Sequence, residues 1–155
     1  MLTAERKWLR DFVRESNWIE GIFRLPTEQE IEASASFLAL FQPSVLELCN
    51  FVEACEPGAR LRDQIGLGVR VGDYIAPPGS LNIRRRLKAL LTSAYQNTWS
   101  PFKIHLQYEM LHPFTDGNGR SGRIIWAWQM RNNGEEISLP FLQHFYYQTL
   151  GETRC

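Results

Sequence analysis

The sequence predicts a mainly α-helical domain with one short β-hairpin. Apolar residues recur at helical spacing over most of the 155 residues, and 44% of all residues are hydrophobic. One glycine-rich segment, residues 65–75, instead shows the alternation of a strand. This length and apolar content suit one globular domain with one core, which we expect to span residues 1–155.

Three helices are expected in the first half of the chain. Apolar residues at helical spacing predict the first over residues 3–20, and Gly21 ends it. Thr27 and Glu30 have the spacing of a capping box, which predicts the start of the second helix. Its expected core-facing stripe is Ile31, Ala35, Leu38 and Phe41. The third helix is expected over residues 45–52.

The second half predicts the hairpin, over residues 65–78, followed by further helices. Helical stripes cover residues 83–94 and 100–112, and the proline that follows stops the second of them. The segment 124–133 is apolar nearly all round, as a central buried helix is. A last helix is expected over residues 139–150.

Charge and cysteine content argue against several classes of protein. Seventeen Lys and Arg balance seventeen Asp and Glu, so we expect neither nucleic acid nor a membrane surface as a partner. The N-terminus is charged, and no stretch approaches the roughly 20 apolar residues of a membrane span, which predicts a cytoplasmic protein. Cys49, Cys55 and Cys155 are odd in number and lack metal-site spacing, so we expect three free thiols.

The segment from His112 to Arg123, HPFTDGNGRSGR, carries the predicted chemistry. Its Asp-Gly and Asn-Gly pairs are typical of hairpin turns, but the flanking segments are helical, so the glycines lie in a helix-loop-helix junction. A glycine-rich loop that enters a helix directs backbone N–H groups and the positive end of the helix dipole at one point. Phosphate is the usual ligand at such a point.

The side chains around this loop support that interpretation. Arg120 and Arg123 lie in the first turn of the following helix, where cations oppose the dipole unless an anion is bound. Asp116 can hold a magnesium ion that bridges phosphates. His112 is placed to take a proton from a hydroxyl that attacks the phosphate. No P-loop motif and no protein-kinase motif set is present.

These residues resemble the signature of Fic-domain (Fic/Doc family) proteins, H-P-F-x-[D/E]-G-N-G-R-x-x-R, and residues 112–123 fill every specified position. The hairpin over residues 65–78 is similar to the flap of that family. Residues 16–21, SNWIEG, are similar to its inhibitory motif, [S/T]-x-x-x-E-[G/N]. The resemblance covers nearly the whole chain and makes residues 1–26 an N-terminal inhibitory helix segment of a compact helical Fic fold.

The resemblance implies a protein adenylyltransferase (AMPylator), a nucleotidyltransferase that uses ATP and Mg²⁺. It would transfer AMP to a Ser, Thr or Tyr hydroxyl of a target protein and release pyrophosphate. His112 would be the general base, Asp116 the magnesium ligand and Phe114 the anchor of the loop in the core. The implied ATP-binding residues are Gly117, Asn118, Gly119, Arg120, Gly122 and Arg123.

The resemblance also implies autoinhibition and a docking site for the target. Glu20 would pair with Arg123 and occupy the γ-phosphate site, with Ser16 and Gly21 completing the inhibitory motif. The flap would hold the target segment by strand pairing. The implied flap residues are Val69, Arg70, Val71, Tyr74 and Ile75. Self-modification is expected where the protein's own hydroxyls reach the site.

Two alternatives stay open at the level of sequence. Some relatives use the inhibitory glutamate to activate water and remove AMP from a modified protein, and the required residues are the same. The other alternative is a nucleotide-binding regulatory module or toxin–antitoxin component, although the intact His112 and Asp116 argue against it. The sequence specifies neither the target protein nor the oligomeric state.

Overall fold

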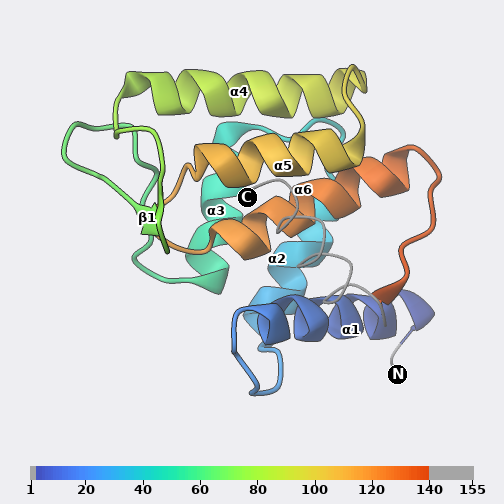
Figure 1. Ribbon diagram of the computed structural model, residues 1–155. Coiled ribbons are helices and arrows are strands. Elements are labelled where there is room, and N and C mark those ends of the chain that lie inside the picture. The colour runs from blue at the N-terminus through green and yellow to red at the C-terminus, as the bar shows by residue number, and fades with distance from the viewer. Residues whose placement is uncertain (1–2, 140–155) are drawn as a thin grey trace.

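The computed structural model describes residues 3–139, and in this range the chain forms six helices and one two-stranded sheet (Figure 1). The elements are α1 (Ala4–Ile19), α2 (Glu28–Leu38), α3 (Val45–Cys55), β1 (Arg70–Val71), β2 (Tyr74–Ile75), α4 (Leu81–Gln96), α5 (Pro101–Leu111) and α6 (Asn118–Asn132). The mainly α class with a short hairpin is therefore confirmed. The helix predicted over residues 139–150 lies outside the described residues, apart from its first position.

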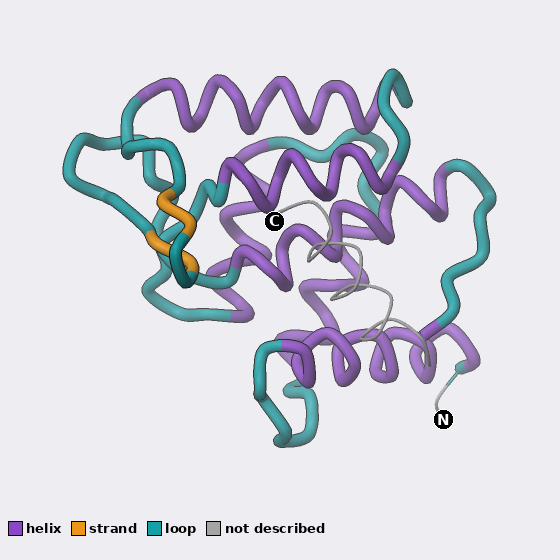
Figure 2. Tube along the Cα trace, in the orientation of Figure 1, coloured by secondary structure: helices purple, strands orange, loops and turns teal. Residues whose placement is uncertain are grey.

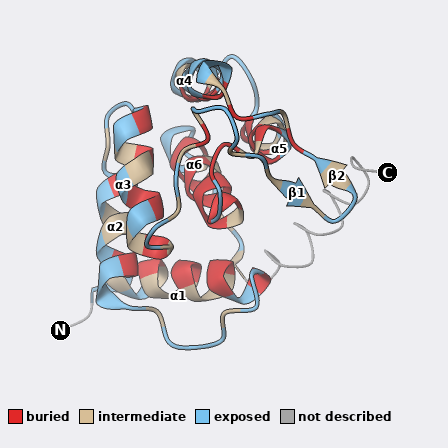
Figure 3. Cartoon of the chain, turned by 90° about the vertical axis from the view of Figure 1, so that its left-hand side faces the viewer, coloured by how far each residue is buried: buried red, intermediate tan, exposed pale blue. Residues whose placement is uncertain are grey.

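Helix α6 is the centre of the fold. It contacts each of the other five helices, and Figure 3 shows it with α1 below, α4 above, α2 and α3 on one side, and α5 on the other. Most of its residues are buried, in agreement with the apolar character that the sequence shows all round this segment. The start of α6 therefore holds a fixed place relative to both α1 and α5.

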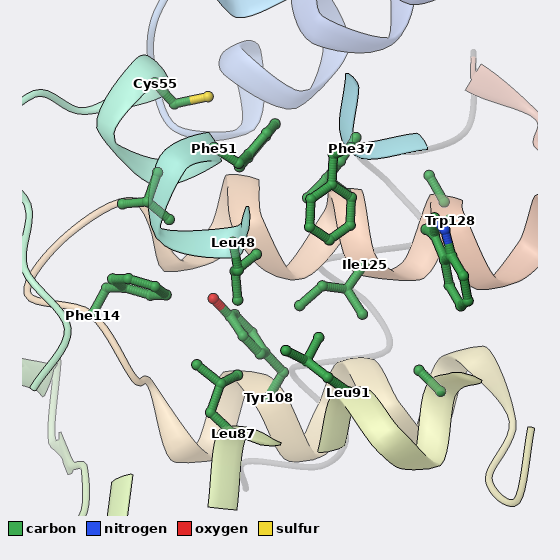
Figure 4. Close-up of a cluster of buried hydrophobic side chains, with 14 of the residues drawn as sticks. Phe37, Leu48, Phe51, Cys55, Leu87, Leu91, Tyr108, Phe114, Ile125 and Trp128 are labelled. Carbon is green, nitrogen blue, oxygen red and sulfur yellow. The ribbon is translucent and has the colours of Figure 1, made fainter. Parts of the chain in front are cut away.

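The hydrophobic core fills the space between α6 and the surrounding helices (Figure 4). Tyr108 of α5 is fully buried there, and its hydroxyl lies 2.5 Å from Oγ of Ser121 in α6. This contact provides the partner that a buried phenol requires. Burial raises the pKa of Tyr108 well above its ordinary value, so the hydroxyl stays protonated and links α5 to α6.

The helix starts follow from local sequence. Five of the six helices begin with a Ser or Thr whose side chain accepts a hydrogen bond from a backbone N–H of the first turn. These N-cap residues are Thr3, Thr27, Ser44, Ser80 and Ser100. Helix α6 differs, because it follows Gly117 and has no side-chain cap. Its first-turn N–H groups are thus left to another acceptor.

The predicted core face of α2 is confirmed except at Phe41. Ile31 is buried, and Ala35 and Leu38 are half-buried and pack against the core. Helix α2 ends at Leu38, and Phe41 lies beyond it with 82% of its surface exposed. The buried residues of α2 are Glu30, Ile31, Ser34 and Phe37. Polar residues can occupy this face because their groups are paired: Oγ of Ser34 donates to the Glu30 carbonyl at 2.9 Å.

Three residues donate hydrogen bonds to the buried Glu30 carboxylate. It accepts hydrogen bonds from the Arg24 side chain at 2.7 and 3.2 Å, from the Thr27 backbone N–H at 2.9 Å and from Nδ2 of Asn17 at 3.3 Å. Burial alone raises the pKa of this carboxyl, but these hydrogen bonds outweigh it and leave the pKa below its ordinary value. Glu30 therefore stays ionised and joins the end of α1 to the start of α2.

The hairpin forms where the sequence predicts it. Arg70 pairs with Ile75 and Val71 with Tyr74 in an antiparallel register. Gly72 occupies the first position of the two-residue turn with a φ of 59°, a conformation that glycine adopts without strain. Figure 2 shows the hairpin at the end of the molecule where α5 is followed by α6.

The cysteines that the structure describes are free, as predicted. Cys55 is buried at the end of α3, and Cys49 is half-buried. Burial raises the pKa of the Cys55 thiol to about 12. Because a protonated thiol is a poor nucleophile, Cys55 is expected to be unreactive in the native protein. Cys155 lies outside the described residues.

Candidate active site

Helix α5 ends at His112 in a left-handed backbone conformation, with φ of 49° and ψ of 62°. Residues other than glycine adopt this conformation only rarely. Pro113 follows and cannot continue the helix, because its ring removes a donor and restricts the preceding residue. The chain therefore turns away at His112, and the imidazole lies at the end of α5 rather than along its side.

The hydrogen bond of the His112 ring defines which nitrogen is basic. Nδ1 lies 3.2 Å from the backbone carbonyl oxygen of Glu109. A carbonyl oxygen only accepts hydrogen bonds, so Nδ1 carries the proton in the neutral ring and Nε2 is the basic nitrogen. This is the tautomer that a general base at Nε2 needs.

The loop after His112 is fixed to the core by Phe114 and Asn118. Phe114 is 1% exposed and pairs with Leu61 in an isolated β-bridge. Oδ1 of Asn118 accepts from the Phe114 N–H at 2.9 Å, and Nδ2 of Asn118 donates to the Phe114 carbonyl at 2.8 Å. The Asn118 side chain, predicted to bind phosphate, thus closes the loop, and its contact with phosphate stays a prediction.

The start of α6 has the character of an anion site. Gly117 has a φ of 76°, and no side chain caps the first-turn N–H groups that follow it. Uncapped N–H groups at a helix start attract anions. Asp116 is exposed beside them, and its Oδ1 accepts from the Gly117 N–H at 2.7 Å.

Arg120 joins the start of α6 to the end of α3. Nη1 donates to the Cys55 carbonyl at 2.8 Å, and Nη2 donates to Oε2 of Glu56 at 2.6 Å. A cation is favourable here, because the last carbonyls of α3 carry partial negative charge. The sequence predicts Arg120 as a phosphate ligand, whereas these contacts show it positioning the loop within the fold.

Arg123 is 1% exposed and pairs with the end of α1. Nε donates to Oγ of Ser16 at 2.8 Å, and Nη2 donates to the Ser16 carbonyl at 3.0 Å. Nη2 also contacts Oε1 of Glu20 at 2.6 Å in a charge-assisted hydrogen bond. Arg123 therefore lies together with Ser16 and Glu20, two residues singled out from sequence that precede it by more than 100 positions.

The end of α1 explains the glycine in the sequence SNWIEG. Gly21 has a φ of 76°, and its N–H donates to the Trp18 carbonyl, while the Ile22 N–H donates to the Asn17 carbonyl, each at 3.0 Å. This is a Schellman motif, which favours glycine at its left-handed position. Glu20 is the C-cap residue just before it, so the motif fixes the point at which Glu20 leaves the helix.

The glycines of the signature have different surroundings. A Cβ atom on Gly119 would collide with the Glu20 carboxylate, so the Glu20 side chain lies against the backbone of the loop. A Cβ atom on Gly122 would instead meet Tyr108 Cδ1 at 2.9 Å and Glu109 Oε1 at 2.8 Å in α5. Gly122 thus permits close packing of α5 on α6, and its predicted contact with ATP has no support in this arrangement.

Replacing Gly122 by alanine is expected to destabilise the fold by about 1–3 kcal/mol, because the added methyl group overpacks the α5–α6 contact. Chemical denaturation of the two proteins measures the change in the free energy of unfolding. Gly68→Ala is the matched control, since no atom lies within 4 Å of a Cβ added there. Equal destabilisation by both substitutions would contradict the packing role of Gly122.

The flap adjoins the end of α5. The Tyr74 hydroxyl donates to the Met110 carbonyl at 2.6 Å, which ties β2 to the last turn before His112. Val69, Val71 and Tyr74 are half-buried, and Arg70 and Ile75 are exposed. The docking role of these residues stays a prediction, and their position beside the end of α5 suits it.

Two buried or half-buried residues near the site belong to no motif in the sequence. Arg62 contacts the His112 carbonyl, and Glu56 pairs with Arg120. Each acts across a long separation in the chain, and neither has a neighbouring residue pattern that distinguishes it from an ordinary surface charge. Sequence reasoning therefore had no signal by which to select them.

Two further features concern membranes and metals. Among residues 3–139, no helix has both the length and the apolar character needed to span a membrane. The same part of the chain has no group of three or more His, Cys, Asp or Glu side chains able to hold a metal ion. Asp116 is a single, exposed hard-oxygen ligand, which fits Mg²⁺ bound jointly by one carboxylate and substrate phosphates.

The helical fold and the loop over residues 112–123 are those of a Fic-type domain, and comparison with known protein families agrees. The model of the Fic/DOC family matches residues 47–130, which is more than half of the chain. The protein therefore belongs to the Fic/DOC family, whose members are generally protein-modifying transferases. The matched range includes His112–Arg123 and the flap, whereas Ser16–Gly21 lies outside it. No curated protein matches the chain.

Proposed function

We propose that the protein is an adenylyltransferase that transfers AMP from ATP to a hydroxyl of a target protein and is inhibited by its own Glu20. One observation carries the proposal: a basic imidazole nitrogen, an uncapped helix start and the buried Arg123 converge on the connection between α5 and α6. A base and a set of preorganised phosphate ligands are the groups that nucleotidyl transfer requires.

In the proposed reaction, Nε2 of His112 takes the proton from the target hydroxyl. The hydroxyl oxygen forms a bond to the α-phosphorus, the bond from that phosphorus to the bridging oxygen breaks, and pyrophosphate leaves. The first-turn N–H groups of α6 stabilise the negative charge on the phosphate oxygens. Arg123 binds the γ-phosphate with its guanidinium once Glu20 has moved away.

Asp116 is the proposed protein ligand for the magnesium ion that accompanies ATP. Asp116 would hold the ion beside the phosphates, where its positive charge would offset theirs. The carboxylate is exposed at the mouth of the loop, and one of its oxygens is oriented by the Gly117 N–H.

Replacing Asp116 by alanine is expected to weaken ATP binding in the presence of Mg²⁺ but not in its absence. Loss of an outer-sphere partner already lowers metal affinity by about 10-fold, so loss of a direct ligand should cost at least as much. Calorimetric titration with and without Mg²⁺, in the Glu20→Gly background, measures the difference. Asp73→Ala, in the exposed turn of the hairpin, is the control; a magnesium effect of equal size in both variants would remove the role of Asp116.

The contacts of Glu20 support the proposed autoinhibition. Its carboxylate pairs with the guanidinium proposed for the γ-phosphate and lies against Gly119 in the loop. A phosphate group at that point would meet a negative charge of the same sign and would lose its arginine partner. ATP is therefore expected to bind weakly, or in an unproductive pose, while Glu20 is in place.

Labelled ATP tests the proposed reaction directly. The Glu20→Gly protein is incubated with Mg²⁺ and ATP labelled at either the α- or the γ-phosphate, with a cell lysate as the source of targets. AMP transfer leaves protein-bound label only from α-labelled ATP, and mass spectrometry then identifies the target and any self-modified residue. Label retained from γ-labelled ATP would indicate phosphoryl transfer and overturn the proposal.

The contact between Glu20 and Gly119 also favours a second candidate, the removal of AMP from a modified protein. A carboxylate against the phosphate-binding loop could activate a water molecule for attack on the protein-bound AMP. An AMP-modified target separates the two functions. If the protein is a hydrolase, the wild type releases AMP and Glu20→Ala does not. If it is a transferase, neither protein releases AMP.

A further inference from the structure

Arg62 lies between α3 and the flap and is 0% exposed. Full burial of an arginine is unusual, because removal of a guanidinium from water is costly unless its donors are satisfied. Burial lowers the pKa of Arg62 from its ordinary value, yet an arginine stays protonated at neutral pH. The fold therefore keeps a buried positive charge at this point.

The Arg62 side chain donates to four backbone carbonyls in two segments. Towards α5, Nε donates to the His112 carbonyl at 2.7 Å and Nη2 to the Leu111 carbonyl at 2.9 Å. Towards the flap, Nη1 donates to the carbonyls of Leu67 at 3.0 Å and Pro77 at 2.7 Å. These two flap residues lie at the two ends of the hairpin, so one guanidinium spans its base and the end of α5.

The backbone of Arg62 makes the same connection. Its N–H donates to the Pro113 carbonyl at 2.8 Å, and its own carbonyl accepts from the Ser80 N–H at 3.1 Å. Gly79 adds to the close fit, because a Cβ atom there would lie 2.8 Å from the Leu67 carbonyl that Arg62 binds. The residue is thus built into both the start of the signature loop and the base of the flap.

The contacts at the end of α5 explain how Arg62 affects the position of His112. The last carbonyls of a helix have no partner within the helix and carry partial negative charge. Here the Glu109 carbonyl faces the His112 ring, the Met110 carbonyl accepts from Tyr74, and Arg62 binds the next two. Arg62 and the flap therefore complete the turn that orients the imidazole.

We propose that Arg62 is a positioning residue that fixes the left-handed turn at His112 relative to the flap. The inference rests on the proposed function, in which the flap holds the segment whose hydroxyl His112 deprotonates. Both partners of this proton transfer, the His112 ring and the segment held by the flap, depend on Arg62. It binds two carbonyls at the end of α5 and two at the base of the flap. ATP binding does not, because Arg62 contacts none of the groups proposed for the phosphates.

The chemistry of arginine makes the substitution informative. Lysine retains the charge but donates from a single nitrogen, so it cannot reach carbonyls on both sides as the planar guanidinium does. Arg62→Lys should retain the fold while loosening the connection between the flap and α5. Arg62→Met removes the donors and leaves the carbonyls unpaired. Arg60→Met is the matched control, because the Arg60 side chain is exposed and, within residues 3–139, donates its hydrogen bond to Gln64.

The first experiment measures self-modification of the Glu20→Gly protein with and without these substitutions. In Arg62→Lys, the maximal rate is expected to fall by about 100-fold, the effect of a small misplacement at a reacting centre. The calorimetric affinity and stoichiometry for ATP should stay unchanged, which shows that the protein is folded. A fall in ATP stoichiometry that matches the fall in rate, or an equal loss in Arg60→Met, would overturn the proposal.

The second experiment does not depend on activity. The chain has three histidines, so long-range ¹⁵N–¹H correlation spectra can resolve the ring of His112, assigned with a His112→Asn variant. The wild-type ring is expected to carry its proton on Nδ1, and Arg62→Lys to lose this preference. An unchanged ring in Arg62→Lys contradicts the positioning role. If the spectra change while the Glu20→Gly parent transfers no AMP, the positioning role stands and the proposed function fails.

Discussion

Replacement of His112 by alanine is expected to lower the rate of AMP transfer by about 10²- to 10⁴-fold, the usual effect of removing a general base. The ring takes its proton from the hydroxyl and is not one of the groups proposed to bind the phosphates. ATP binding should therefore stay close to that of the parent protein. The measurement is the rate of self-modification with α-labelled ATP in the Glu20→Gly background, with calorimetry of ATP on the same samples.

The backbone at His112 requires a second variant, because alanine disfavours the left-handed conformation observed there. Asparagine adopts this conformation more readily than most residues but supplies no base. His112→Asn should thus preserve the turn and still be inactive. If His112→Asn transferred AMP at the parental rate, His112 would act through the backbone turn, and its role as a base would be wrong.

Much of the fold could be predicted because its signals are local. The N-cap residues, the capping box of Thr27 and Glu30, and Gly21 at the end of α1 depend on residues within a few positions of one another. The hairpin follows similarly from its glycine turn. Helix starts and ends are therefore readable without knowledge of the tertiary structure.

The polar residues on the core face of α2 could not be predicted in the same way. Glu30 lies on that face because its carboxylate accepts hydrogen bonds from Arg24 and from Nδ2 of Asn17 in α1. A count of apolar residues assigns such polar positions to solvent and extends the predicted stripe to Phe41. Only the fold shows that the Arg24 guanidinium, in the connection between α1 and α2, neutralises the buried carboxylate.

The candidate site shows the same division between local and distant contacts. The loop and its helix start are encoded in twelve consecutive residues, whereas the roles of Asn118, Arg120 and Gly122 depend on what they meet in the fold. From the sequence alone, an Arg or a Gly in such a loop can be explained equally well by phosphate binding and by packing. The structure adds a carboxylate partner for Arg120 and a close contact of Gly122 with α5, while phosphate binding by either residue stays a prediction.

Replacement of Glu20 by glycine is expected to raise self-modification by at least about 10-fold, since the carboxylate competes with a phosphate for the buried Arg123 guanidinium. One charge-assisted hydrogen bond to the guanidinium is lost, but Arg123 still donates to Oγ and to the backbone carbonyl of Ser16, which hold it in place. ATP affinity should increase together with the rate. The rates are compared at matched ATP and Mg²⁺ concentrations.

Three variants define the mechanism of this activation. Glu20→Gln retains the size of the side chain without its charge, so it should activate less than Glu20→Gly if packing against Gly119 also contributes. Arg123→Ala breaks the same pair but deletes the proposed phosphate ligand, and it should be inactive both alone and combined with Glu20→Gly. If Glu20→Gly modified itself no faster than wild type, the contact with Arg123 would be only the end of a helix packed on its neighbour. If the Arg123→Ala combination were as active as Glu20→Gly, inhibition would instead depend on the contact between the carboxylate and Gly119.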